Sequence, residues 1–202
     1  SYIIMGSLYV HIPFLVTLVA GDILAGEATG GTYRLLLTRP LSRFTMVTSK
    51  FIATLISTNL LVLFMALLSM GLGVWALGTG EIVVIQSQIT IIAENDSLWR
   101  FFIAYGYAAL AMTTVSSIAF LLSSLVENAI GPIMTTMAII IVFTIISAIQ
   151  IPFFDYVRPL FFTTHMQGWK HVFSDPVDWE RLITSGSVLL GHIVACYGAT
   201  LY

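Results

Sequence analysis

Five long stretches without a charged side chain constrain most strongly how this 202-residue chain can fold. They cover residues 1–21, 51–80, 101–126, 128–154 and 182–202. A transmembrane helix needs about 20 apolar residues to cross roughly 30 Å of hydrocarbon, and each stretch is long enough. Because unsatisfied backbone groups are costly in lipid, each stretch is expected to be helical. The sequence therefore predicts an all-α integral membrane protein, a polytopic helical bundle with five spans in a single transmembrane domain over residues 1–202.

The composition and the charge pattern exclude several classes of protein. Hydrophobic residues make up 58% of the chain and charged residues 9%, whereas about a quarter of the residues in a soluble domain are charged. The net charge is −2 and no basic face is visible, so nucleic acid is not an expected partner. The single cysteine, Cys196, rules out an intrachain disulfide and a cysteine-based metal cluster.

The sequence contains none of the catalytic motifs that a membrane enzyme would need. Its two lysines, Lys50 and Lys170, lie in Ser-Lys-Phe and Trp-Lys-His, so neither ends the Gly-rich loop of a Walker A motif. The patterns HExxH and G-x-S-x-G are absent as well. No apolar stretch holds a carboxylate in its interior, which argues against an aspartyl protease and a proton relay. We expect no catalytic residue, no metal site and no cofactor on this chain itself.

Residues 21–50 form a charged island, GDILAGEATGGTYRLLLTRPLSRFTMVTSK, between two uncharged stretches. The island holds four of the eight cationic residues of the chain: Arg34, Arg39, Arg43 and Lys50. Residues 22–37 suit a helix interrupted by two glycines, and a second helix, capped by Thr38, would lead into the next span. We interpret the island as a water-side segment that is presented to a soluble partner. The alternative is a solvated linker whose cations meet anionic lipid, at about 1 kcal/mol each.

Residues 152–180 form a second polar region, which is rich in aromatic side chains. Aromatic rings favour the membrane–water interface, so this region is expected to contain short helices that lie in the interface or re-enter the membrane. With five spans, the island shares one side with the turn at Glu127, and the aromatic region shares the other with residues 81–100. Each side carries four Lys and Arg residues, so the positive-inside rule does not orient the chain by count.

Several shorter patterns predict local structure. Asn128 is a candidate helix cap and Pro132 suits the first turn of the helix that follows. The run Ile82–Ile85 suits a strand, a short helix or an interfacial segment. Serine and threonine are frequent in the second to fourth predicted spans. One interpretation is a polar lining for a translocation path, and the other is helix packing, because small hydroxyl residues let helices approach and bond.

The island also carries a series of motifs that runs from an acidic exit of one span to the entry of the next: Asp22, Glu27, Gly31-Thr32, Leu35-Leu36-Leu37, Arg39-Pro40, Arg43 and Lys50. In these motifs the chain resembles permease subunits of the ABC-2 family, the membrane half of ATP-binding-cassette exporters. The Ser123-Ser124-Leu125 turn and the long aromatic region before the last span are compatible with that family. Such permeases usually have six spans, and the chain resembles spans two to six.

The resemblance implies a role for the island. In this family the segment after the second span is cytoplasmic and forms a coupling helix in a groove of a separate ATPase subunit. The residues that match are Glu27, Thr32, Tyr33 and Arg34, with Arg39, Arg43 and Lys50 in support. The turn from Ser124 to Asn128, which includes Glu127, would be a second and smaller contact. Residues 152–180 would be extracytoplasmic and would cap the exit path.

The resemblance also implies partners and a location. The partners would be an ABC ATPase subunit, which carries ATP and Mg, and a second permease copy or homologue. The chain would be a multi-pass protein of the cell membrane (inner or plasma) that couples ATP binding and hydrolysis on the ATPase to substrate translocation. Two alternatives stay open: an ATP-independent secondary transporter or channel, and a non-transporting membrane scaffold for an ATPase complex. Inverted repeats or intramembrane charges would favour the former, and neither is seen.

Overall fold

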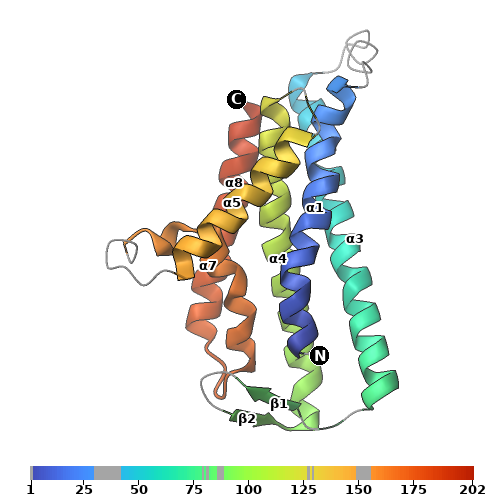
Figure 1. Cartoon of the computed structure of the whole chain (residues 1–202), viewed down its shortest axis with the longest axis vertical. Coiled ribbons are helices and arrows are strands. Elements are labelled where there is room, and N and C mark those ends of the chain that lie inside the picture. Colours follow the sequence, from blue (N-terminus) through green and yellow to red (C-terminus); the bar gives the residue numbers. More distant parts are fainter. Residues whose placement is uncertain are drawn as a thin grey trace.

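The structure, a computed structural model, describes residues 2–29, 42–78, 80, 82–85, 89–126, 128, 130–148 and 156–202. Its elements are, in order, α1 (Tyr2–Thr29), α3 (Arg43–Leu77), β1 (Ile82–Ile85), β2 (Ile89–Ile92), α4 (Glu94–Leu125), α5 (Ile130–Ala148), η1 (Arg158–Leu160), α7 (Phe162–Met166), η2 (Gln167–Phe173) and α8 (Trp179–Leu201). In Figure 1, α1 rises from the lower to the upper end of the molecule, α3 descends, and α4 rises again. The C-terminus lies at the upper end, and the ends are named below as they stand in this view.

Four helices are long and apolar enough to cross a membrane, over residues 43–76, 96–125, 130–147 and 179–201. They are α3, α4, α5 and α8, and they correspond to the second to fifth predicted spans. The first predicted span falls in α1, where the residues with described side chains give a shorter apolar helix, His11–Gly26. The polytopic helical class is confirmed, with four helices of full spanning length and one shorter apolar helix among the residues that the structure describes.

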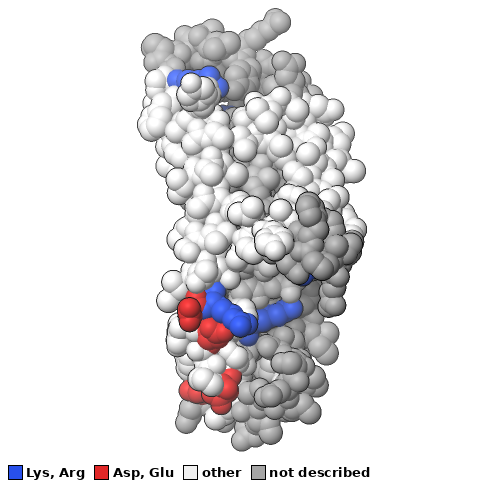
Figure 2. All heavy atoms as spheres, turned by 90° about the vertical axis from the view of Figure 1, so that its left-hand side faces the viewer, with Lys and Arg blue, Asp and Glu red and all other residues white. Residues whose placement is uncertain are grey.

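The charged side chains are separated along the long axis of the molecule. On the face drawn in Figure 2, one group of Lys and Arg lies near the upper end, and a mixed group of both signs lies in the lower part. Between them the described residues of this face are uncharged over a broad zone. Because charge is expensive in hydrocarbon, this distribution is typical of a protein that spans a bilayer.

The lower end of the molecule carries the one departure from an all-helical fold within the described residues. Strands β1 and β2 pair antiparallel, with Ile82 opposite Ile92 and Ile85 opposite Ile89. The run Ile82–Ile85, for which the sequence leaves three possibilities, is therefore a strand. Its Val84 is buried, and so is Ile92 of the partner strand, so the hairpin packs an apolar face onto the bundle.

Local capping explains where two of the spanning helices begin. The side-chain oxygen Oδ1 of Asn128 accepts a hydrogen bond from the Ile130 N–H at 3.0 Å, and Pro132 lies in the first turn of α5, so both predictions are confirmed. Helix α3 begins later than predicted. Its N-cap is Ser42, whose Oγ accepts from the Thr45 N–H at 3.1 Å, and the predicted cap Thr38 lies outside the described residues.

Helix α4 is the centre of the bundle, because it packs against α1, α3, α5, α8 and η2. Its buried residues include small ones that permit close helix approach, such as Ala104, Ala111 and Ala119. The hydroxyls of its buried Thr114, Ser116 and Ser117 donate to carbonyls of α4 itself, at 2.7 to 3.1 Å. These serines and threonines are therefore satisfied within the packed helix, which supports the packing interpretation for α4.

The chain between α5 and α8 contributes to the core. Helix α5 slants outward in Figure 1, and the chain then descends through α7 and η2 beside α8. The side chains of Phe162, Met166, Trp169 and Phe173 are at most 2% exposed and belong to the same buried cluster as α4 residues. This segment therefore forms an inner layer against α4 and α8.

Candidate functional site

The candidate site lies at the upper end, where four helices converge around the segment that the sequence singles out. The end of α1, the start of α3 and the ends of α4 and α8 meet there in a cluster of buried side chains, called here the upper-end cluster: Leu24, Val47, Phe51 and Phe120, with Ile23, Leu55, Ile193, Tyr197 and Leu201 packed against them. The ring of Phe51 lies edge-on to Phe120, with centroids 5.3 Å apart, and 4.7 Å from Tyr197. The Thr48 and Tyr197 hydroxyls bond at 2.8 Å. These contacts fix the end of α1 and the start of α3, which carry the two ends of the island, against α4 and α8.

Helix α1 is joined to α4 by the side chain of Ser123. Its Oγ donates to the Gly21 carbonyl at 2.6 Å and accepts from the Ala25 N–H at 3.0 Å and from the Leu24 N–H at 3.3 Å. Ser123 is 2% exposed, so these bonds lie out of water. The three bonds to the α1 backbone are called here the Ser123 joint.

Helix α1 approaches α5 closely at the same level. A Cβ on Gly21 would lie 2.8 Å from Cγ1 of Ile133 and 3.4 Å from Cβ of Pro132, closer than side-chain atoms normally pack. Glycine is therefore required there by the contact with the first turn of α5. The end of α1 thus lies in a corner formed by α4 and α5.

Lys50 connects α3 to α1 at the same end. Its Nζ donates to the Ile23 carbonyl at 3.2 Å, and the side chain is half-buried. The sequence places Lys50 among the supporting coupling residues. The structure places its ammonium on the backbone of α1, at the residue next to Leu24 of the Ser123 joint. Arg43, by contrast, is exposed at the first position of α3.

The other predicted coupling residues are located only in part. Thr32, Tyr33, Arg34, Arg39 and Glu127 lie outside the described residues. Glu27 lies in the last turns of α1, where its backbone is helical.

Ser124 is exposed, and its hydroxyl donates to the Leu121 carbonyl of its own helix at 2.6 Å. Sequence reasoning selected this serine and missed its neighbour Ser123, which is the one that contacts α1. A signal was available, because Ser116, Phe120 and Ser123 continue one buried row of α4 at helical spacing.

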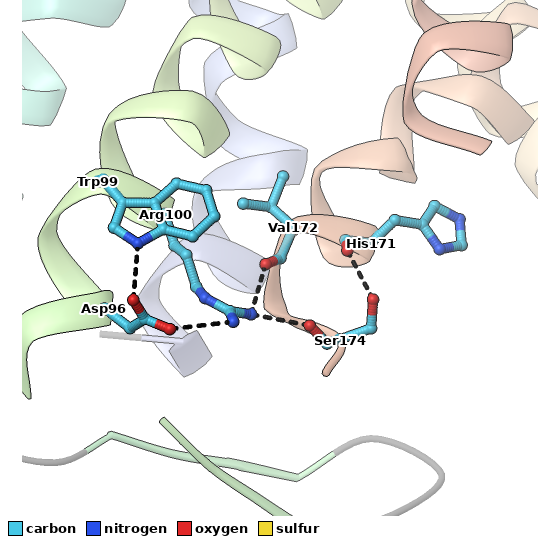
Figure 3. A network of polar contacts seen from close by, with 6 residues as sticks. All are labelled: Asp96, Trp99, Arg100, His171, Val172 and Ser174. Atoms are coloured by element: carbon cyan, nitrogen blue, oxygen red, sulfur yellow. Dashed lines mark hydrogen bonds and ion pairs between the residues drawn. The ribbon is translucent and has the colours of Figure 1, made fainter. Parts of the chain in front are cut away.

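The lower end holds a buried cation that the sequence did not single out (Figure 3). The Arg100 side chain is 5% exposed, and its Nη1 donates to the carbonyls of Val172 at 3.0 Å and Ser174 at 2.7 Å. Its Nη2 lies 3.5 Å from Asp96 Oδ2, and Asp96 also accepts from the indole of Trp99. Arg100 therefore joins the start of α4 to the end of η2.

Within the described residues, no three His, Cys, Asp or Glu side chains are grouped so that they could hold a metal ion. The His165 ring bonds instead to the Ser185 hydroxyl and the Pro159 carbonyl, at 3.1 and 2.8 Å. Its backbone carbonyl accepts from the Tyr107 hydroxyl at 2.7 Å. This histidine therefore ties α7 to α4 and α8 in the described structure.

Comparison with known proteins gives one family. A family model described as "ABC-2 family transporter protein" matches residues 4–165. Over 149 residues the chain is 28% identical to "Uncharacterized protein YhcI" of Bacillus subtilis (strain 168). The matched region covers 72% of this chain and 48% of that protein. The chain thus spans about half the length of this curated relative. No solved structure matches the chain.

Proposed function

Because the chain belongs to the ABC-2 transporter family, we propose that it is the membrane permease subunit of an ABC-type exporter. In this role it lies in the cell membrane (inner or plasma) and couples ATP binding and hydrolysis on a separate ATPase subunit to substrate translocation. ATP and Mg are held by that subunit. Its four spanning helices support the placement in a membrane.

The observation that carries the coupling role is the convergence of helices at the upper end. The island includes the end of α1 and the start of α3, and these two helices are bonded to each other through Lys50 and Ile23. Helix α1 is also bonded to the central helix α4 through Ser123. A force applied to the island by a partner therefore reaches the centre of the bundle through side chains that are already in contact.

The surface offered to the ATPase consists of the predicted coupling residues. Glu27, Thr32, Tyr33 and Arg34 form its centre, and Arg39, Arg43 and Lys50 support it. Ser124 and Glu127 form the smaller second contact. The exposed Arg43 and Ser124 flank the end of the bundle from α3 and α4, which is the arrangement that a partner seated on the upper end would need.

A second permease copy or homologue is the other proposed partner. In the spanning windows of α5 and α8, only 11% of the residues are buried inside the chain, so most of each window is open to lipid or to another subunit. Large side chains such as Ile183, Leu190 and Val194 of α8 are more than half exposed. Apolar surfaces of this kind can face either lipid or another subunit. In a dimer, part of them would line a central cleft between the two permeases.

Co-purification tests the proposal. The tagged full-length chain is isolated in mild detergent and the proteins that accompany it are identified by mass. A stoichiometric ATPase with its own Walker A motif is the expected result. A chain that purifies without a nucleotide-binding protein under these conditions contradicts the proposal and leaves the secondary transporter or channel as the function to test. A co-purified ATPase with no vectorial transport of any lipid or peptide tried would favour the scaffold.

A further inference from the structure

We infer that the Ser123 hydroxyl is a positioning group that transmits movement between the cytoplasmic end of α1 and the central helix α4. The inference rests on the proposed function, because it concerns the same coupling end of the bundle. Ser123 is not one of the residues that the sequence pattern selects for coupling. Its role follows from where its oxygen lies relative to the α1 backbone.

The oxygen lies between two groups that an α-helix normally pairs. An α-helix bonds the N–H of residue i to the carbonyl of residue i−4, which here would join Ala25 to Gly21. Ser123 Oγ contacts both, at 3.0 Å from the Ala25 nitrogen and 2.6 Å from the Gly21 oxygen. The Leu24 N–H is the third partner, at 3.3 Å. A hydroxyl has one donor and two acceptor sites, so α1 uses all three of them.

Helix α1 runs without a break from Tyr2 to Thr29, so the three bonds attach Ser123 Oγ to one turn of a continuous helix. The turn from Gly21 to Ala25 is therefore the place where the α1 backbone is bonded to α4. Beyond it lie the last residues of α1, including Glu27, and then the rest of the island. At the start of this turn, Gly21 is packed against Ile133 of α5. Four residues beyond the end of the turn, α1 ends at Thr29.

The geometry separates this role from ordinary packing. Leu24 and Phe120 already bury the α1–α4 contact through apolar side chains, at 5% and 0% exposure. If packing alone were needed, an alanine at position 123 would serve as well, because the apolar contact does not involve the hydroxyl. The hydroxyl adds a bond of fixed direction between the two backbones, and this bond is the feature that transmits a movement of the end of α1 to α4.

The test compares variants in the complex of the full chain with its ATPase subunit. Ser123→Ala is expected to keep the ATPase bound but to lower the permease-dependent stimulation of ATP hydrolysis about tenfold, as for the loss of one well-made hydrogen bond. Ser117→Ala is the matched control, because this serine is also buried in α4 and its hydroxyl donates to the Thr113 carbonyl of the same helix. Ser123→Thr keeps a hydroxyl and is expected to restore most of the stimulation. Should Ser123→Ala fail to fold, Ser123→Cys, nearly the same size with a weak donor, replaces it.

A distance measurement gives a second readout that a purely structural role would not change. Nitroxide labels are placed at Thr29→Cys, beyond the joint, and at Leu125→Cys, in a Cys196→Ala background. In the otherwise unchanged complex we expect a narrow distance distribution that shifts on addition of ATP and vanadate. With Ser123→Ala we expect a broad distribution that does not shift. The probes used are ATP and vanadate, so no substrate is required.

The outcomes distinguish the inference from the proposed function. If no ATPase accompanies the unchanged chain, the proposed function and the inference both fail. If the ATPase is bound and stimulated, and Ser123→Ala behaves like Ser117→Ala in both assays, the inference alone is wrong. Loss of stimulation and of the distance shift in Ser123→Ala, with recovery in Ser123→Thr, supports it.

Discussion

The Lys50 ammonium of α3 donates to the Ile23 carbonyl of α1 at 3.2 Å, across the two helices that the charged island connects. A half-buried hydrogen bond to a charged group contributes about 1 kcal/mol or somewhat more. Replacing Lys50 by Met keeps much of the apolar stem and removes the charge. We expect Lys50→Met to lower the free energy of unfolding by about 1 kcal/mol, measured as a lower thermal midpoint in detergent. Arg43→Met, at an exposed position, is the control, and an equal loss in both variants would contradict the structural role of Lys50.

Glu27→Lys tests the centre of the proposed coupling surface. Reversing this charge in the last turns of α1 places repulsion where the proposed ATPase groove receives the island. We expect permease-dependent ATPase stimulation to be abolished while membrane insertion and monodispersity are kept. The charge reversal Glu180→Lys, on an exposed residue at the start of α8, serves as the control. Stimulation that stays at the level of the unchanged complex would remove Glu27 from the coupling surface.

Arg100→Met tests the buried cation at the lower end. The substitution leaves the Val172 and Ser174 carbonyls without the donor that they share. Leaving buried polar groups unsatisfied costs about 3 kcal/mol here, so the thermal midpoint should drop clearly. The matched control is Arg181→Met, whose ion pair with Asp178 lies on a side chain that is 72% exposed. A pair so exposed is worth less than about 1 kcal/mol. Equal midpoints for the two variants would show that Arg100 does not hold η2.

Two glycines allow a paired test of the corner that receives α1. A Cβ on Gly21 would lie 2.8 Å from Ile133, whereas a Cβ on Gly191 of α8 meets nothing within 4 Å. We expect Gly21→Ala to destabilise the fold by about 1–3 kcal/mol through overpacking. Gly191→Ala should be neutral or stabilising by up to about 1 kcal/mol, because alanine favours the helix. Thermal unfolding of both variants in the same detergent measures the difference, and a stable Gly21→Ala variant would place α1 farther from α5.

The helical class and several local features could be predicted because short-range physics determines them. Lipid forces long uncharged stretches into helices, and the cap at Asn128 depends only on residues next to it. The start of α3 was less predictable. Thr38 and Ser42 are both good caps, and the choice between them depends on how the chain arrives at the helix. The strand Ile82–Ile85 was ambiguous because a run of four apolar residues fits both the periodicity of a helix and that of a strand.

The candidate site was predictable at the level of the segment but less so at the level of individual atoms. Ser123 and Ser124 are neighbours in sequence, yet their side chains differ by about 100° around the helix, so only the position of α1 decides which one matters. The partners of Arg100 are backbone carbonyls 72 and 74 residues away. Because every residue has a carbonyl, no residue type in the sequence marks such a contact.

The buried position of Arg100 has a consequence for the synthesis of the protein. Helix α4 leaves the ribosome before Val172 and Ser174 have been made, so the guanidinium is first exposed without the carbonyls that later receive it. A chain that stalls before residue 172 lacks both of these carbonyls and keeps only the Asp96 contact for this cation, at the edge of its third long apolar segment. Synthesis of residues 172–174 therefore removes a polar defect at the edge of this apolar segment.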